Sequence, residues 1–200
     1  MKDKEVKDFA DHNIKTVRYT VAHDAIIPVV NPNNAVKGLT MAQLKDIFAG
    51  KIRSWDEVGG AKAPIVVVGR DSSSGTFESW DHFVMKKAKV TPKAQMLASN
   101  GALVTAVSKN KYAIAYLGIG YVNKSVKPLQ VNGITASLQT AMSKAYPFSR
   151  ELYMYTDGEP HGSIAKYIAF VKSAEGQKIV AREGFVPLMD AKKVSGRGKK

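Results

Sequence analysis

A buried strand that leads directly into a helix is the feature of this sequence that most restricts its fold. Residues 64–69 (PIVVVG) have the continuous apolar composition of a buried strand. Four apolar residues then recur at the spacing of one helix face: Phe77, Trp80, Phe83 and Val84. Units in which a helix follows a strand are typical of α/β proteins.

The same alternation continues on both sides of this unit. The other expected strands are residues 16–30, 112–122 and 150–157, with residues 184–188 as an extended piece. The other expected helices are residues 2–12, 40–50, 99–110, 163–172 and 174–183. Thr40 and Gln43 have the spacing of a capping box, and Gly50 marks the end of that helix. The pattern predicts an α/β sandwich with a largely parallel sheet.

Composition excludes several classes of site. Of the 200 residues, 44% are hydrophobic, which is enough for a sizeable core. The chain has no cysteine, so disulfides, thiolate metal sites and a cysteine nucleophile are excluded. The four histidines do not have the spacing of metal ligands: His12, His23, His82 and His161. We therefore expect neither a metal nor a cofactor.

The charge of the chain indicates an anionic partner. The formal net charge is +13, which favours phosphate, nucleic acid or an anionic surface. Lysines are scattered along the sequence, and this distribution argues against nucleic acid. The dense cluster is at residues 191–200, which we expect to be a basic disordered tail.

The loop between the strand and the helix at residues 64–87 is rich in hydroxyl groups. Ligands of open α/β sheets lie beyond the carboxyl ends of strands, and a helix N-terminus presents unpaired N–H groups. The Arg70 guanidinium, the hydroxyls of Ser73, Ser74 and Thr76, and the Gly75 backbone would together form an oxyanion cradle. The alternative is that Ser74 or Thr76 only caps the helix.

Enzymatic sites fit the sequence less well. A Walker A loop requires a lysine directly after its second glycine, and no lysine follows Gly75. The chain also has no G-x-S-x-G nucleophile elbow. Asp24 beside His23 could belong to a hydrolytic site, but its segment is more typical of a strand start. We expect no enzyme activity, and the remaining enzymatic alternative is one that acts on phosphate esters.

Four separated blocks resemble the phosphate-binding proteins of bacterial and archaeal ABC transporters. The blocks, in the order of that family, are GLTMAQLKDIFAGKIRSWDEVGG, PIVVVGRDSSSGTFESW, AIAYLGIGYV and YPFSRELYMYT. The resemblance covers about residues 2–188. It implies a type II periplasmic-binding-protein fold, in which two α/β lobes are joined by two crossing strands and phosphate lies between the lobes.

The resemblance also implies a division of this chain. Residues 31–146 would form an intact second lobe that carries the anion loop. Residues 1–30 and 147–190 would be the remnant of a first lobe, because the family begins with a further segment that carries another phosphate loop. We therefore expect a truncated form that binds phosphate weakly or not at all when alone.

The family signature R-x-x-x-S-G-T falls on the hydroxyl-rich loop. Arg70 would neutralise the anion, Ser74 and Thr76 would donate hydroxyls, and the amides of Gly75 and Thr76 would donate N–H groups. Some members have an aspartate two residues after the arginine. Here that place is Ser72, and an aspartate directly follows Arg70 instead.

The function implied by the resemblance is that of a solute-binding protein, which passes inorganic phosphate to the membrane permease of an ABC-type uptake system. Such a protein would be periplasmic or extracellular if exported, although the charged start of this chain lacks the apolar core of a signal peptide. The alternative is a sensor or interaction module of the same fold. For either function, the exposed strand edges of the incomplete lobe favour self-association.

Overall fold

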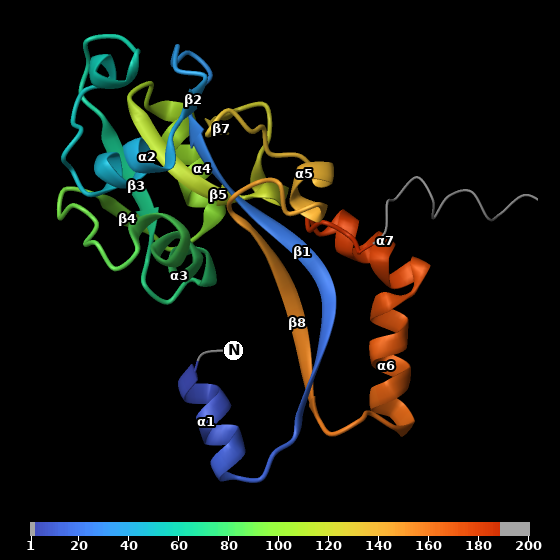
Figure 1. Ribbon diagram of the computed structural model, residues 1–200. Coiled ribbons are helices and arrows are strands. Elements are labelled where there is room, and N and C mark those ends of the chain that lie inside the picture. The colour runs from blue at the N-terminus through green and yellow to red at the C-terminus, as the bar shows by residue number, and fades with distance from the viewer. Residues whose placement is uncertain (1–2, 189–200) are drawn as a thin grey trace, which may run out of the picture. The chain divides into compact units, whose positions relative to one another are not determined.

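The computed structural model describes residues 3–188 and divides the chain into two compact units (Figure 1). The larger unit is Asp24–Arg150, and the smaller unit combines Met1–His23 with Glu151–Lys200. The predicted tail at residues 191–200 lies outside the described residues. Within residues 3–188, every helix is too short or too polar to span a lipid bilayer.

The larger unit is built on a mixed sheet in the strand order β4-β3-β5-β1-β6. These strands are β1 (Thr16–Val30), β3 (Val66–Arg70), β4 (Gln95–Leu97), β5 (Ala113–Gly118) and β6 (Lys127–Pro128). β3 is parallel to both β4 and β5, as the sequence predicts. A parallel two-stranded sheet of β2 (Gly38–Leu39) and β7 (Gln130–Val131) lies apart from it.

The prediction of a largely parallel sheet is wrong for β1, which pairs antiparallel with β5 and with β6. In the first of these pairs Ile26 faces Gly118 and Val30 faces Ile114. Because β1 and β5 are not consecutive strands, no single crossover helix fixes their relative direction. Alternation of elements along the sequence therefore does not determine how β1 is oriented.

The helices of the larger unit agree with the predicted segments and add short ones. They are α2 (Met41–Phe48), the 3₁₀ turns Trp55–Val58 and Ile119–Tyr121, α3 (Gly75–Trp80), α4 (Asn100–Lys109) and α5 (Leu138–Met142). The capping box of α2 is confirmed: the Thr40 hydroxyl accepts from the Gln43 amide at 3.1 Å, and the Gln43 side chain accepts from the Thr40 amide at 2.9 Å. α3 continues into a π-helical turn, Asp81–Met85.

β8 (Ser149–Asp157) pairs with β1, and both strands are shared between the units. The smaller unit contains residues 16–23 of β1, residues 151–157 of β8 and three helices, while Arg150 of β8 belongs to the larger unit. The helices are α1 (Asp3–Asp11), α6 (Gly162–Lys172) and α7 (Ala174–Arg182). The buried side chain of Gln177 ties α7 to the unit, since it donates to the Val21 carbonyl at 2.9 Å and accepts from the Leu188 amide at 2.7 Å. Gly176 permits the tight α6–α7 turn, because a Cβ there would clash with the Phe170 carbonyl oxygen.

An aromatic cluster forms the centre of the larger unit. Trp80 of α3 stacks on Tyr116 of β5 with ring centroids 4.4 Å apart and an angle of 8° between the planes. Phe48 and Phe148 pack on the same indole at 4.8 and 5.6 Å. These side chains are at most 1% exposed. The cluster therefore holds α3 against the sheet just beyond the predicted anion loop.

We predict that Trp80→Ala destabilises the protein strongly, because it removes the ring that joins α3 to β5. Loss of a buried tryptophan side chain costs about 3–5 kcal/mol. The free energy of unfolding, measured with urea, should fall by that amount. Tyr121→Ala, at a side chain that is 50% exposed, is the control and should change it by less than about 0.5 kcal/mol. A loss below about 1 kcal/mol for Trp80→Ala would contradict the role given to the cluster.

Candidate anion-binding site

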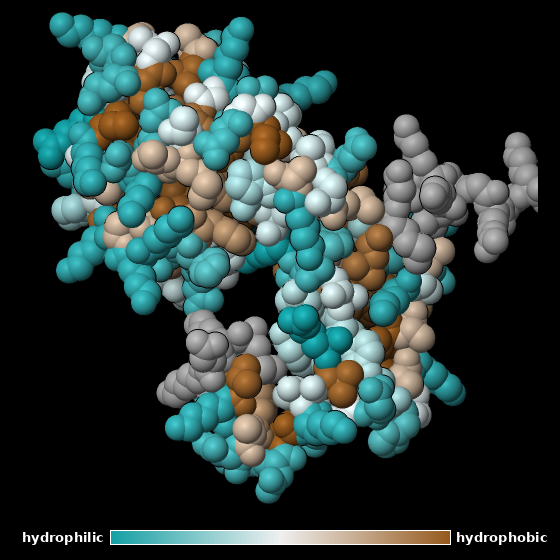
Figure 2. All heavy atoms as spheres, viewed as in Figure 1, coloured by the Kyte–Doolittle hydropathy of each residue, from teal (hydrophilic) through white to brown (hydrophobic). Residues whose placement is uncertain are grey.

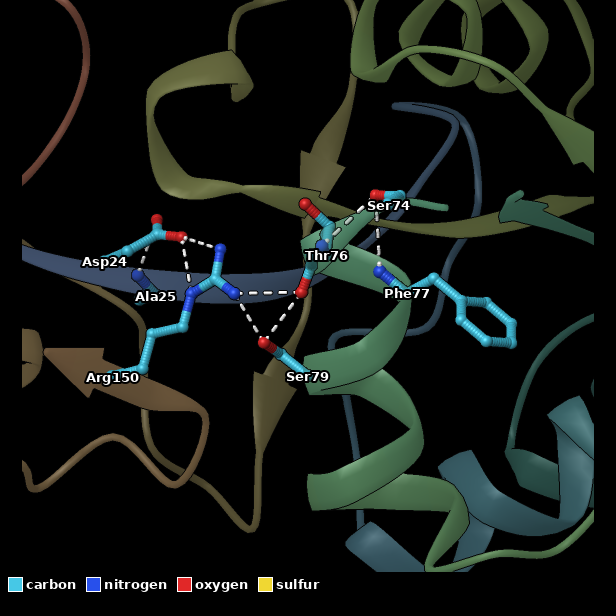
Figure 3. A network of polar contacts seen from close by, with 8 residues as sticks. Asp24, Ala25, Ser74, Thr76, Phe77, Ser79 and Arg150 are labelled. Carbon is cyan, nitrogen blue, oxygen red and sulfur yellow. Dashed lines mark hydrogen bonds and ion pairs between the residues drawn. The ribbon is translucent and has the colours of Figure 1, made fainter. Parts of the chain in front are cut away.

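The loop of residues 71–74 joins the end of β3 to the start of α3, where Figure 3 shows Ser74, Thr76 and Phe77. Ser74 is the N-cap residue, with an extended backbone at φ −84° and ψ 128°. Its hydroxyl oxygen accepts from the amides of Thr76 at 3.1 Å and Phe77 at 3.4 Å. The capping role weighed from the sequence is therefore present for Ser74.

Capping does not use the whole hydroxyl group of Ser74. The two amides meet its oxygen, so the hydroxyl hydrogen is still a donor. The Thr76 amide, however, points at Ser74 in this arrangement, although the family resemblance implies that it donates to the anion. The Gly75 amide has no intrahelical acceptor because the helix begins there. Ser74 can thus cap α3 and donate to a ligand at the same time.

Arg70 is the last residue of β3 and is held from several directions. Its backbone amide donates to the Tyr116 hydroxyl at 3.2 Å, and its Nε donates to the Leu97 carbonyl at 3.2 Å. Its side chain is 14% exposed, and its Nη2 lies 3.6 Å from a carboxylate oxygen of Asp71. Burial raises the pKa of Tyr116 to about 12, so this hydroxyl stays neutral at physiological pH. The guanidinium is therefore fixed by a hydrogen bond at Nε, whereas its Nη2 has only the more distant carboxylate of Asp71 as an ionic partner.

Asp71 gives Ser73 a different partner from the predicted one. The Asp71 carboxylate accepts from the Ser73 amide at 3.0 Å and from the Ser73 hydroxyl. The hydrogen bond from this hydroxyl, with help from the Arg70 guanidinium, lowers the pKa of Asp71 below its ordinary value. The Ser73 hydroxyl therefore donates within the loop, and an anion would compete with Asp71 for both Ser73 and Arg70.

Thr76 and Gly75 differ in exposure. Thr76 is 8% exposed, whereas Gly75 lies open to solvent. A Cβ added at Gly75 would meet the Arg150 Nη1 at 3.9 Å, which is an ordinary contact. Packing within the described residues thus gives no reason for glycine at this position. Close approach of a ligand to the backbone would give one.

Two residues of this region were missed as site residues by sequence reasoning. Arg150 of β8 donates through its Nη1 to the Gly75 carbonyl at 2.9 Å. Its Nε and Nη2 donate to one oxygen of the Asp24 carboxylate at 3.0 and 2.7 Å. Asp24 was weighed for a hydrolytic site, but here it is the ionic partner of Arg150. The two lie 126 positions apart, so no local pattern could have joined them.

Comparison with known proteins places the chain in a family. Residues 1–175 match the model of the PBP superfamily domain, and the chain belongs to that superfamily. This confirms the α/β fold and the family resemblance drawn from the four sequence blocks. Within residues 3–188, no three acidic or histidine side chains come together as a metal site.

Several relatives of this chain are named phosphate-binding proteins. The chain is 30% identical to the phosphate-binding protein PstS of Pseudomonas aeruginosa over 211 residues, covering 94% of this chain and 65% of that protein. It is 32% identical to PstS of Borreliella burgdorferi over 177 residues, covering 82% of this chain and 63% of that protein. The chain therefore spans just under two thirds of the length of these relatives.

Solved structures show the same relationship. A putative phosphate ABC transporter substrate-binding protein with bound phosphate from Clostridium perfringens is 34% identical with a TM-score of 0.82. That comparison covers 94% of this chain and 76% of the other. An ABC-type phosphate transport receptor from Vibrio cholerae is 30% identical with a TM-score of 0.80, covering 93% and 76% of the two chains.

We predict that Ser74→Ala lowers both stability and phosphate affinity. Loss of a serine N-cap costs about 0.5–2 kcal/mol of unfolding free energy. Loss of its donated hydrogen bond should weaken phosphate binding by about 0.5–1.5 kcal/mol. Ser99→Ala is the matched control, because Ser99 caps α4 by accepting from the Ala102 amide at 3.1 Å. Ser99→Ala should lower the stability and leave the phosphate affinity unchanged. If Ser74→Ala and Ser99→Ala have the same effect on phosphate affinity, Ser74 acts only as a helix cap.

Gly75→Ala should separate affinity from stability. Since the added methyl group fits, unfolding free energy should stay constant or rise by about 0.4–1 kcal/mol. Phosphate affinity should fall because the methyl group covers the exposed backbone. Gly101→Ala, in the first turn of α4 where a Cβ also meets one atom at 3.9 Å, is the control for stability. Undiminished phosphate binding by Gly75→Ala in calorimetry would remove Gly75 from the site.

Proposed function

We propose that this chain binds inorganic phosphate as the solute-binding component of an ABC-type phosphate uptake system. The observation that carries the proposal is the position of Arg70, a largely buried guanidinium at the carboxyl end of β3, next to the turn that begins α3. The phosphate-bound relative from Clostridium perfringens supports phosphate as the anion, since it is 34% identical over 94% of this chain.

In this proposal five residues donate to phosphate: Arg70, Ser73, Ser74, Gly75 and Thr76. Arg70 supplies the positive charge, and a charge-assisted hydrogen bond to an anion is stronger than a neutral one. Ser74 and Thr76 are 6% and 8% exposed, so their hydroxyls are held in place before the ligand arrives. Ser73 turns from Asp71 to the anion, which its exposed position allows.

The proposal includes binding without chemical conversion of the ligand. Phosphate would be released to the membrane permease of the transporter, and the protein would act on the side of the membrane from which phosphate is taken up. The names of the relatives from Clostridium perfringens and Vibrio cholerae, which place those proteins in phosphate ABC transport, support the permease as partner. Turnover of a generic phosphomonoester by the purified protein would favour the enzymatic alternative.

A second candidate function is that of an interaction module of the same fold. In the smaller unit, hydrophobic side chains lie at the surface over α6 (Figure 2). Ile164, Tyr167 and Phe170 of α6 are 57%, 58% and 42% exposed, and they lie three residues apart along the helix. Such a surface favours association with another chain. Calorimetric titration with phosphate distinguishes the candidates, because binding is expected of a solute-binding component and is not required of an interaction module.

We predict that Arg70→Ala weakens phosphate binding by roughly 10- to 150-fold. This range corresponds to the about 1.5–3 kcal/mol of a hydrogen bond to a charged group. Arg70→Lys should also weaken binding, because lysine does not reproduce the planar fork of donors. Arg53→Ala removes the same charge from a guanidinium that donates to the Gly50 carbonyl, and it should leave the affinity within about twofold. Calorimetry that gives Arg70→Ala the affinity of the unchanged protein would contradict the proposed function.

A further inference from the structure

The first turn of α3 is held by a side chain that comes from β8. The Gly75 carbonyl accepts from the Arg150 Nη1 at 2.9 Å and from the Ser79 hydroxyl at 2.8 Å. The same Nη1 also donates to the Ser79 hydroxyl (Figure 3). Arg150 thus contacts the backbone of the proposed phosphate loop, which comprises residues 70–76, at Gly75.

The direction of the Arg150 guanidinium is set by a buried carboxylate. One oxygen of Asp24 accepts from Nε and Nη2 at 3.0 and 2.7 Å, and the other accepts from the Ala25 amide at 2.9 Å. Asp24 is 2% exposed, so its carboxylate is isolated from water. A buried carboxylate without its partner is strongly unfavourable, and the pair is therefore confined to one geometry.

The contact with Gly75 determines where the next amide points. The peptide group is planar and trans, so the Gly75 carbonyl and the Thr76 N–H point in opposite directions. When Arg150 fixes the carbonyl, it also directs the Thr76 N–H to the Ser74 hydroxyl, 3.1 Å away. The orientation of Ser74 thereby depends on Arg150, although the two side chains lie on different elements.

Arg150 has little capacity left to bind an anion directly. An arginine side chain has five N–H donors, and Arg150 makes four hydrogen bonds, two to Asp24, one to Gly75 and one to Ser79. The charge of Asp24 also offsets its own. An effect of Arg150 on phosphate would therefore come through the geometry of the loop and not through a charge contact.

We propose that Arg150, oriented by Asp24, is a positioning residue for the phosphate loop. The proposal rests on the proposed function, because it assigns Arg150 to the same site. It sets the Gly75–Thr76 peptide and the Ser74 hydroxyl in the arrangement that receives the anion. Arg150→Met should lower phosphate affinity about tenfold or more, and Arg150→Lys should lower it too, since one ammonium group cannot hold Asp24 and Gly75 together as the fork does.

Two measurements on the full chain test this proposal. Calorimetry gives the phosphate affinity, and hydrogen exchange in the absence of phosphate gives the protection of the Thr76 and Phe77 amides. We expect Arg150→Met to lower the affinity and to speed the exchange of both amides. Arg53→Met, with the same change of charge, should alter neither. Val107→Ala, a buried change in α4, controls for lost stability and should leave the affinity unchanged.

The outcomes separate this proposal from the proposed function. If the unchanged protein does not bind phosphate, the proposed function fails, and hydrogen exchange still decides whether Arg150 orders the loop. Unaltered exchange or unaltered affinity in a folded Arg150 variant overturns the positioning role. A loss of affinity of the same size in Val107→Ala also overturns it, because general destabilisation would then explain the effect. If Arg150→Met does not fold, Arg150→Lys is measured in its place.

Discussion

The stack of Trp80 on Tyr116 is the interaction on which the arrangement of the site depends. It joins α3 to the sheet at a centroid distance of 4.4 Å. The hydroxyl of the same Tyr116 accepts from the Arg70 amide at 3.2 Å, so one residue supports the strand end before the loop and, through Trp80, the helix after it. Arg70 ends β3 and Gly75 begins α3, and the chain between them has little freedom once both ends are fixed. A preorganised loop of this kind loses less conformational entropy when it binds an anion.

Two arginine–aspartate pairs contact the loop, and they differ in distance and burial. Arg150 and Asp24 make two hydrogen bonds, the shorter 2.7 Å long, and the carboxylate side chain is 3% exposed. Arg70 lies 3.6 Å from Asp71, whose side chain is 36% exposed. The first pair is tight and buried, while water screens the second and weakens it. In the proposed function, Arg70 would consequently be the cation that exchanges its carboxylate for a phosphate oxygen, and Arg150 would be the one that holds the loop in place.

The sequence predicted the parts of the structure that depend on neighbouring residues. The strand at 64–69, the helix face of Trp80, and the capping box at Thr40 follow from local periodicity and spacing, and all are present. The strand-to-helix turn between Arg70 and Thr76 was predictable because strand ends and helix starts have local signals, and its role in binding an anion stays a prediction. The antiparallel pairing of β1 with β5 and the Asp24–Arg150 ion pair were not predicted, since both depend on contacts between residues distant in the sequence.

The most direct test of the account is a phosphate titration of the ¹⁵N-labelled protein followed by backbone amide chemical shifts. This measurement locates the anion even where binding is weak. The account predicts the largest saturable shifts at Arg70, Ser73, Ser74, Gly75 and Thr76. Shifts that saturate instead around the cavity of about 360 Å³ lined by Ile47, Arg53 and Lys93, with the loop unchanged, would contradict it.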